Sequence, residues 1–224
     1  MLIRLLSGSM NFYQVIAYVI SALVVIFLTL PFHEFAHAYI ADKMGDKTAR
    51  YMGRLIINPM AHIDYWGALG ILFLGFGWAK PVPVNPANFR NPKVGMAITA
   101  FAGPLMNVLL ASVSWFFYYW VAFLNISRNS VWLFYVSLFF AFFTQINISL
   151  AVFNLIPIPP LDGSRLLNVF LPSKYYFLIM KYERFFTLFI LLLIYTGVLD
   201  GPMSFVSNFI YKIISILPSL IFGF

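Results

Sequence analysis

Three long stretches without a single charged residue limit the fold of this chain more than any other feature. They cover residues 5–32, 94–127 and 129–161. About 20 consecutive apolar residues are enough for a helix to cross the hydrocarbon core of a bilayer. Only 9% of the residues are charged, whereas ordinary soluble domains carry about 25%. A soluble fold could not cover its surface with so few charges, so the sequence predicts an integral membrane protein embedded in the lipid bilayer.

We expect an all-α membrane protein, a polytopic helical bundle with about four to six membrane segments. The chain is predicted to be a single domain over residues 1–224, with a core of about 11–170 and C-terminal membrane helices over about 174–224. The last stretch, 203–224, is interrupted by Lys212 and could either cross the membrane or lie along its surface. The other predicted membrane helices are Asn11–Met44, 94–127, 129–161 and 185–199.

An irregular element is expected after the first of these helices. Tyr65–Ala79 is uncharged, but it is too short and too rich in glycine for a membrane span, so a re-entrant or interfacial element fits better. Lys80–Pro86 follows it, and its prolines at alternate positions force extended backbone. The sequence therefore predicts one re-entrant or extended element between the first two membrane helices.

Charge distribution predicts the orientation of the bundle and excludes one class of partner. Residues 42–93 carry seven Lys and Arg, and more follow in residues 157–184, so both regions are expected on the cytoplasmic side. No basic surface interleaved with aromatic residues is present, which argues against a nucleic-acid partner. The chain has no cysteine. Any metal site must therefore use histidine, aspartate or glutamate.

The first uncharged stretch runs directly into the sequence His33-Glu34-Phe35-Ala36-His37. Residues four apart on a helix lie on one face, about 6 Å apart along the axis, so two imidazoles at this spacing can hold one zinc ion. Glu34 then lies close enough to act on a water molecule at that ion. The plainer interpretation is a pair of core histidines satisfied by local hydrogen bonds. A carboxylate and two histidines within a membrane helix are costly, however, and favour a functional site.

A second polar motif stands at the end of the third uncharged stretch. The segment Asn154–Gly163 contains prolines at 157, 159 and 160, which must break a helix and would expose Asp162 within a membrane-embedded cavity. Catalytic zinc usually has three protein ligands, so Asp162 is the best third ligand beside His33 and His37. Glu183 and Asp64 are rivals, but both stand among charged or basic residues.

Together these two motifs resemble the site-2 protease family of intramembrane zinc metalloproteases, in the short form that lacks PDZ or CBS domains. The second motif matches the pattern N-x-x-P-x-P-x-L-D-G, and the resemblance extends over roughly residues 30–170. It implies one Zn2+ per chain, a transmembrane protein as substrate, and a prokaryotic plasma membrane with the active site toward the cytoplasm. The residues implied are Glu34 as general base, Asn154 as a donor to the substrate carbonyl, and His33, His37 and Asp162 as metal ligands.

Two other functions remain open at this level. A metal transporter could use the same three ligands as a transit site, although it would not need Glu34 at that spacing. A proteolytically silent scaffold could bind client helices. Three smaller questions also stay open: whether Asn107 steadies the site or only joins two helices, whether His62 is more than a loop histidine, and whether Lys80–Val84 receives an unwound substrate as an added strand.

Overall fold

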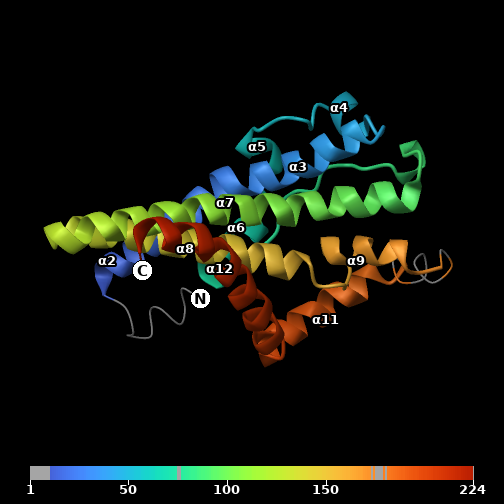
Figure 1. Ribbon diagram of the computed structural model, residues 1–224. Coiled ribbons are helices and arrows are strands. Elements are labelled where there is room, and N and C mark those ends of the chain that lie inside the picture. The colour runs from blue at the N-terminus through green and yellow to red at the C-terminus, as the bar shows by residue number, and fades with distance from the viewer. Residues whose placement is uncertain (1–10, 75–76, 173, 175–178, 180, 224) are drawn as a thin grey trace.

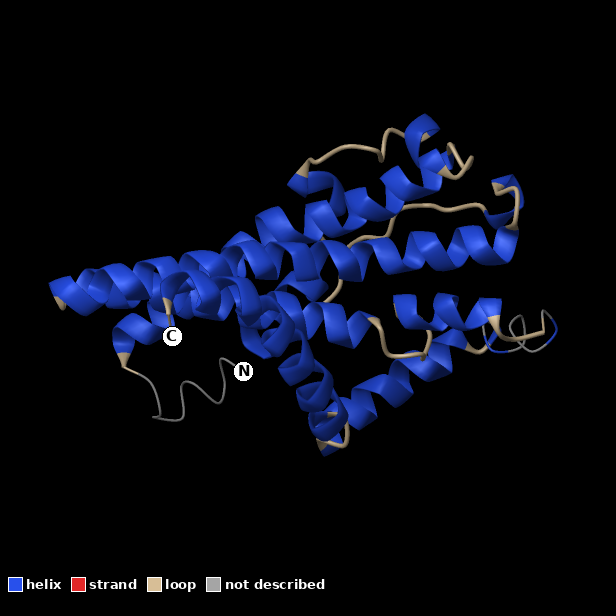
Figure 2. Cartoon of the chain, in the orientation of Figure 1, coloured by secondary structure: helices blue, strands red, loops and turns tan. Residues whose placement is uncertain are grey.

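The computed structural model describes residues 11–74, 77–172, 174, 179 and 181–223. Within these residues the chain is helical, and its one β-bridge joins Ile63 to Ala79 (Figures 1 and 2). Four helices are long and apolar enough to cross a membrane, as the sequence predicts. The helices are α2 (Phe12–Val24), α3 (Leu30–Lys43), α4 (Thr48–Tyr51), α5 (Pro59–His62), α6 (Tyr65–Leu74), α7 (Pro92–Arg128), α8 (Val131–Asn154), α9 (Asp162–Leu166), α11 (Glu183–Thr196) and α12 (Asp200–Phe222).

The first predicted span is one continuous helix with a widened turn in its middle. It begins at Asn11, whose side chain and that of Gln14 cap each other's backbone N–H groups. Between α2 and α3 the chain forms a π-helical turn, η2 (Val25–Thr29), immediately before Pro31. Proline cannot donate a backbone hydrogen bond, so an irregular turn next to it is expected. The histidine motif therefore follows an irregular turn within one continuous helix.

Helix α7 is the centre of the molecule and contacts α3, α8, α9 and α12 (Figure 1). Helix α8 is shorter than the sequence predicts, because it ends at Asn154 and not at Leu161. Pro157, Pro159 and Pro160 supply no N–H groups to continue the helical ladder, although the segment stays uncharged. The chain leaves the helix as an irregular segment and begins α9 at Asp162.

The predicted irregular element is a short helix followed by extended chain. Helix α6 packs against α2, and the Tyr18 hydroxyl of α2 donates to the carbonyl of Ile71 in α6 at 3.1 Å. Gly75 and Phe76 lie outside the described residues. Beyond them the chain runs without regular structure alongside α3 to the short 3-10 turn η3 (Pro86–Asn88), visible as the long loop in Figure 2. The predicted extended backbone at residues 80–86 is confirmed up to the start of η3.

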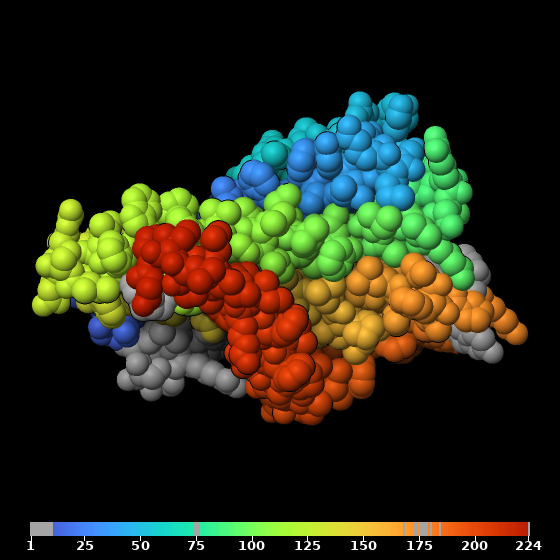
Figure 3. Space-filling view, viewed as in Figure 1, coloured from blue at the N-terminus to red at the C-terminus, as the bar shows by residue number. Residues whose placement is uncertain are grey.

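The C-terminal helices differ most from the helix core. Helix α11 has 14 residues and is too short for the span predicted at 185–199. Helix α12 is long enough to cross a membrane, yet little of it is buried, and Figure 3 shows it lying on the face in view. Its anchor to α7 is Trp115, whose indole N–H donates to Ser215 Oγ at 2.8 Å. The apolar surface of α12 is suited to lipid contact.

Candidate metal centre

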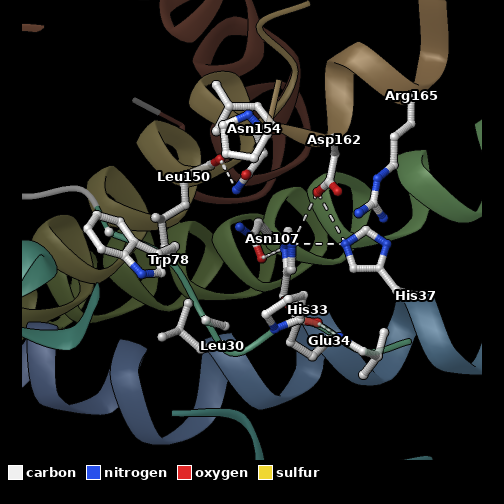
Figure 4. A pocket seen from close by; sticks show the side chains of 16 residues that line it. Leu30, His33, Glu34, His37, Trp78, Asn107, Leu150, Asn154, Asp162 and Arg165 are labelled. Atoms are coloured by element: carbon white, nitrogen blue, oxygen red, sulfur yellow. Dashed lines mark hydrogen bonds and ion pairs between the residues drawn. The ribbon is translucent and has the colours of Figure 1, made fainter. Parts of the chain in front are cut away.

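His33, His37 and Asp162 converge on one point, although Asp162 is far from the histidines in sequence (Figure 4). The two histidines lie on successive turns of α3, and Asp162 is the first residue of α9. Asp162 Oδ2 lies 3.3 Å from His33 Nε2 and 3.2 Å from His37 Nε2. The two Nε2 atoms are 3.0 Å apart. The three predicted ligands are thus brought together.

The backbone after α8 explains how Asp162 reaches the histidines. The prolines turn the chain back, and α9 then packs its first turn directly against the carbonyls of Leu155 and Ile156. Only glycine fits at position 163, because an added Cβ would overlap those two carbonyl oxygens. This close approach fixes the start of α9 and aims Asp162 at α3.

Hydrogen bonds behind the histidines determine which ring nitrogens face the centre. His37 Nδ1 donates to the carbonyl oxygen of Thr99 at 2.7 Å, and a carbonyl can only accept. His33 Nδ1 lies 3.2 Å from Asn107 Oδ1, the corresponding partner on α7. With the hydrogen on each Nδ1, both Nε2 atoms carry lone pairs. Asn107 therefore contacts a predicted ligand as well as joining α7 to α3.

These contacts fit a bound cation. When both histidines are neutral and carry their hydrogen on Nδ1, two Nε2 lone pairs and a carboxylate oxygen face one another at 3.0–3.3 Å with no proton donor between them. Three electron-rich atoms in such an arrangement repel unless a positive charge lies among them. A tetrahedral zinc ion with ligand bonds near 2.1 Å would separate its ligands by about 3.4 Å, close to the spacing seen here. The donor set and spacing therefore suit Zn2+.

Gly103 leaves the space that the metal centre needs. A Cβ at this position would overlap His37 Nε2 and lie 2.6 Å from His33 Nε2. We expect Gly103→Ala to lose most bound zinc, measured as metal per purified chain. Gly201→Ala is the matched control, because no atom lies within 4 Å of its added Cβ. Full zinc occupancy in Gly103→Ala would show that the histidines do not hold the metal where the structure places them.

Replacing Asn107 by alanine should weaken zinc binding without removing a ligand. The substitution leaves the buried His33 Nδ1 without its partner, and loss of such an outer partner typically costs about 10- to 100-fold in metal affinity. Competition with a fluorescent chelator would measure the change. Asn107→Asp keeps an acceptor at the same place and should retain tight binding. Equal affinities for wild type and Asn107→Ala would assign Asn107 to helix packing alone.

Glu34 is held at the edge of the same cavity by the extended segment. The carboxylate, which is buried, accepts a hydrogen bond from the backbone N–H of Val82 at 2.9 Å. Lys80 N–H is also used, because it donates to the carbonyl of His62, and the prolines at 81 and 83 have no N–H. From Lys80 to Pro83 no backbone donor is free. A peptide docked along these four residues would find acceptors only, so a complete β-ladder cannot form there.

Val82→Pro tests the contact between this segment and Glu34. Proline fits extended backbone but has no N–H, so the Glu34 carboxylate would lose this hydrogen bond. Because a hydrogen bond to a charged group is a strong one, we expect hydrolysis to fall about tenfold or more. Zinc content should stay unchanged. Val84→Pro is the matched control, because Val84 N–H has no partner within the described part of the chain. Undiminished hydrolysis by Val82→Pro would remove the backbone contact from the mechanism.

The remaining predicted residues lie at different distances from this centre. Asn154 lines the cavity, and its amide nitrogen donates one hydrogen to the carbonyl of Leu150 at 3.0 Å. His62 is fully buried, but it contacts the carbonyl of Ile56 and does not line the cavity. Asp64 caps Gly67 and is not a rival ligand. The cavity measures about 200 Å³. It is also lined by Arg165, which the sequence did not indicate as a site residue.

Comparison with known proteins agrees with this geometry. The sequence model of a family described as peptidase family M50 matches residues 21–136 and 121–195. These two matches together cover more than half of the chain. The chain belongs to peptidase family M50. The resemblance to site-2 proteases is thereby confirmed, and this M50 peptidase is a zinc metalloprotease and an integral membrane protein.

Individual relatives of the M50 peptidase are similar over most of its length. YwhC of Bacillus subtilis is 38% identical over 149 residues, covering 66% of this chain and 68% of its own. MJ0392 of Methanocaldococcus jannaschii is 28% identical, covering 69% of this chain and 35% of its own. Rip2 of Mycolicibacterium smegmatis is 29% identical, covering 61% and 51%. Their names describe zinc metalloproteases. No solved structure matches the chain.

Proposed function

We propose that this M50 peptidase hydrolyses a peptide bond in or near a transmembrane segment of another membrane protein. The observation that supports this proposal most is the position of the candidate ligands on a membrane-spanning helix. His33 directly follows the uncharged stretch 5–32 and lies about 15 Å before the last residue of a helix long enough to span the membrane. A substrate bond that reaches these residues would therefore lie in or near the membrane.

Six residues in or beside the cavity have roles in this proposal, together with the backbone carbonyl of Thr99. His33, His37 and Asp162 hold zinc, with Asn107 and the Thr99 carbonyl orienting the two imidazoles. Zinc, when bound, would polarise the substrate carbonyl and lower the pKa of water toward neutral pH.

Proton transfer and carbonyl binding fall to the chain's own side chains. Glu34 takes a proton from the attacking water and delivers it to the leaving amine. Asn154 donates its remaining amide hydrogen to the carbonyl oxygen as negative charge develops there.

The charge pattern supports an orientation for the site. The end of α3, the following loops and the start of α7 carry the cluster of basic residues predicted to be cytoplasmic. Asp162 enters from the same end of the bundle, as Figure 1 shows for α9. We therefore propose that the active site lies toward the cytoplasmic side. The bacterial and archaeal sources of the similar proteins support a prokaryotic plasma membrane.

Reconstitution with a single-span membrane protein in liposomes would test the proposed function. Cleavage should map within or beside the apolar segment by mass spectrometry, stop when a chelator removes zinc, and return when zinc is restored. Cleavage confined to soluble loops would contradict an intramembrane function. Zinc flux across the same liposomes, without any cleavage, would instead identify a transporter.

A further inference from the structure

Arg165 is a charged side chain of the catalytic cavity that the proposed mechanism does not use. It stands three residues after Asp162 on α9, so both side chains lie on one face of that helix. It lines the same cavity as Glu34 and the two histidines. Figure 4 shows the side chain reaching past Asp162 toward His37, so its guanidinium group is presented to whatever occupies the cavity.

The guanidinium group of Arg165 has no hydrogen bond or ion pair among the described residues. The acids of the cavity are already engaged, since Asp162 faces the histidines and Glu34 accepts from Val82. Two other arginines of the protein are partnered. Arg50 forms a two-pronged pair with Asp42 at 2.7 Å, and Arg54 donates to the carbonyl of Lys80 at 2.9 Å.

Arg165 is only partly buried, so its unpartnered N–H donors remain available to a molecule that enters the cavity. The guanidinium group has five such donors, and acceptors on a bound molecule would satisfy them in place of water. Charge leads to the same conclusion. With Glu34 and Asp162 ionised, a bound Zn2+ leaves these groups neutral together, and Arg165 adds one positive charge. A loaded cavity therefore attracts an anionic group.

We propose that Arg165 selects substrates by binding a carboxylate close to the scissile bond. The planar guanidinium group matches a carboxylate through two parallel hydrogen bonds. The carboxylate would come from an acidic side chain of the substrate or from the free C-terminus of its chain. This inference rests on the proposed peptidase function.

The position of Arg165 favours substrate selection over catalysis. In Figure 4 Arg165 and Asn154 lie on opposite sides of Asp162. A peptide whose reacting carbonyl faces Asn154 would therefore place a neighbouring residue or its terminus at Arg165. Arg165 is accordingly a residue that reads the sequence around the bond and not a donor to the reacting oxygen.

Binding to zinc-loaded, inactive Glu34→Gln protein would test this inference without requiring hydrolysis. Three apolar peptides of one sequence would be compared by calorimetry: neutral with both ends blocked, the same with one central glutamate, and the neutral form with a free C-terminus. At least one acidic peptide should bind about tenfold or more tightly than the blocked neutral peptide. The glutamate and C-terminal peptides distinguish the two sources of the carboxylate.

Substitution of Arg165 in the same background should abolish this preference. Arg165→Gln should bind all three peptides alike. Arg165→Lys keeps the charge but cannot form two parallel hydrogen bonds, so it should retain part of the difference in affinity between acidic and neutral peptides. Arg128→Gln removes the same charge at an exposed position on α7 and should leave the preference intact. Zinc content verifies that each variant is folded.

Three results would overturn the inference. They are no preference for an acidic peptide in the Glu34→Gln protein, an unchanged preference in Arg165→Gln, or an equal loss of affinity for all three peptides. Failure of the wild type to cleave any membrane substrate would contradict the proposed function instead, while the binding comparison would still report on Arg165.

Discussion

Glu34→Gln should lower peptide hydrolysis by about 100- to 10,000-fold while leaving zinc bound, as expected for loss of a general base. Glutamine cannot take up a proton at the reacting water, but it preserves the shape of the side chain and an oxygen that can accept from Val82 N–H. The three convergent ligands are untouched. Cleavage of a reconstituted membrane substrate and zinc per chain, measured on one preparation, would separate the two effects.

The chain contains its own control for this substitution. Glu183 is the other glutamate, located at the start of α11 and outside the cavity, so Glu183→Gln makes the same chemical change elsewhere. It should retain full hydrolysis. Substantial activity in Glu34→Gln would mean that another group accepts the proton, and loss of zinc in this variant would mean that Glu34 supports the metal.

Asp162→Ala should reduce zinc to a small fraction of one ion per chain. The variant removes one of the three predicted ligands, so its effect should exceed the about 10- to 100-fold that loss of an outer partner causes. Metal analysis after dialysis would measure it, and hydrolysis should disappear with the zinc. The substitution also leaves the two Nε2 atoms facing each other without the carboxylate that joins α9 to α3.

A second aspartate serves as the comparison. Asp200 is exposed at the start of α12, and Asp200→Ala should keep zinc near the wild-type level. If Asp162→Ala kept its zinc too, a different third ligand would be required, and the connection between the two sequence motifs would fail. A thermal melt of both variants would separate metal loss from general unfolding.

The helix core and the two motifs could be predicted because their signals are local. Three long apolar helices, the first span, α7 and α8, follow from hydropathy, and the facing of His33 and His37 follows from helical periodicity alone. The fourth span was predicted at 185–199, whereas α12 is the helix that is long enough. Asp162 could be predicted as a ligand because the prolines before it must end the helix and expose its side chain. The end of α8 was predicted too late, because hydropathy continues through Pro157 while the hydrogen-bonded ladder cannot.

Contacts made by the backbone groups of distant segments could not be predicted. The carbonyl of Thr99 orients His37, and the N–H of Val82 holds Glu34, but backbone groups leave no signal in the residue type. Gly103 was noticeable beside a proline, yet its role depends on α3 lying against α7. Arg165 resembled any other basic residue at a membrane surface, until the fold placed it inside the cavity without a partner.

The widened turn at Val25–Thr29 sets the rotational phase between the two halves of the first helix. Before it, Ser21 faces α8 and donates to the carbonyl of Phe139; after it, His37 faces α7. Each residue of an α-helix advances the rotation by about 100°. A π-helical turn closes its hydrogen bonds over five residues in place of four, so it accommodates one extra residue. If the same residues formed regular α-helix, both histidines would be rotated by about 100° away from Asp162 with every letter of the motifs intact. An intact motif in a related sequence therefore predicts an assembled site only when the helix before it keeps this widened turn or is shorter by one residue.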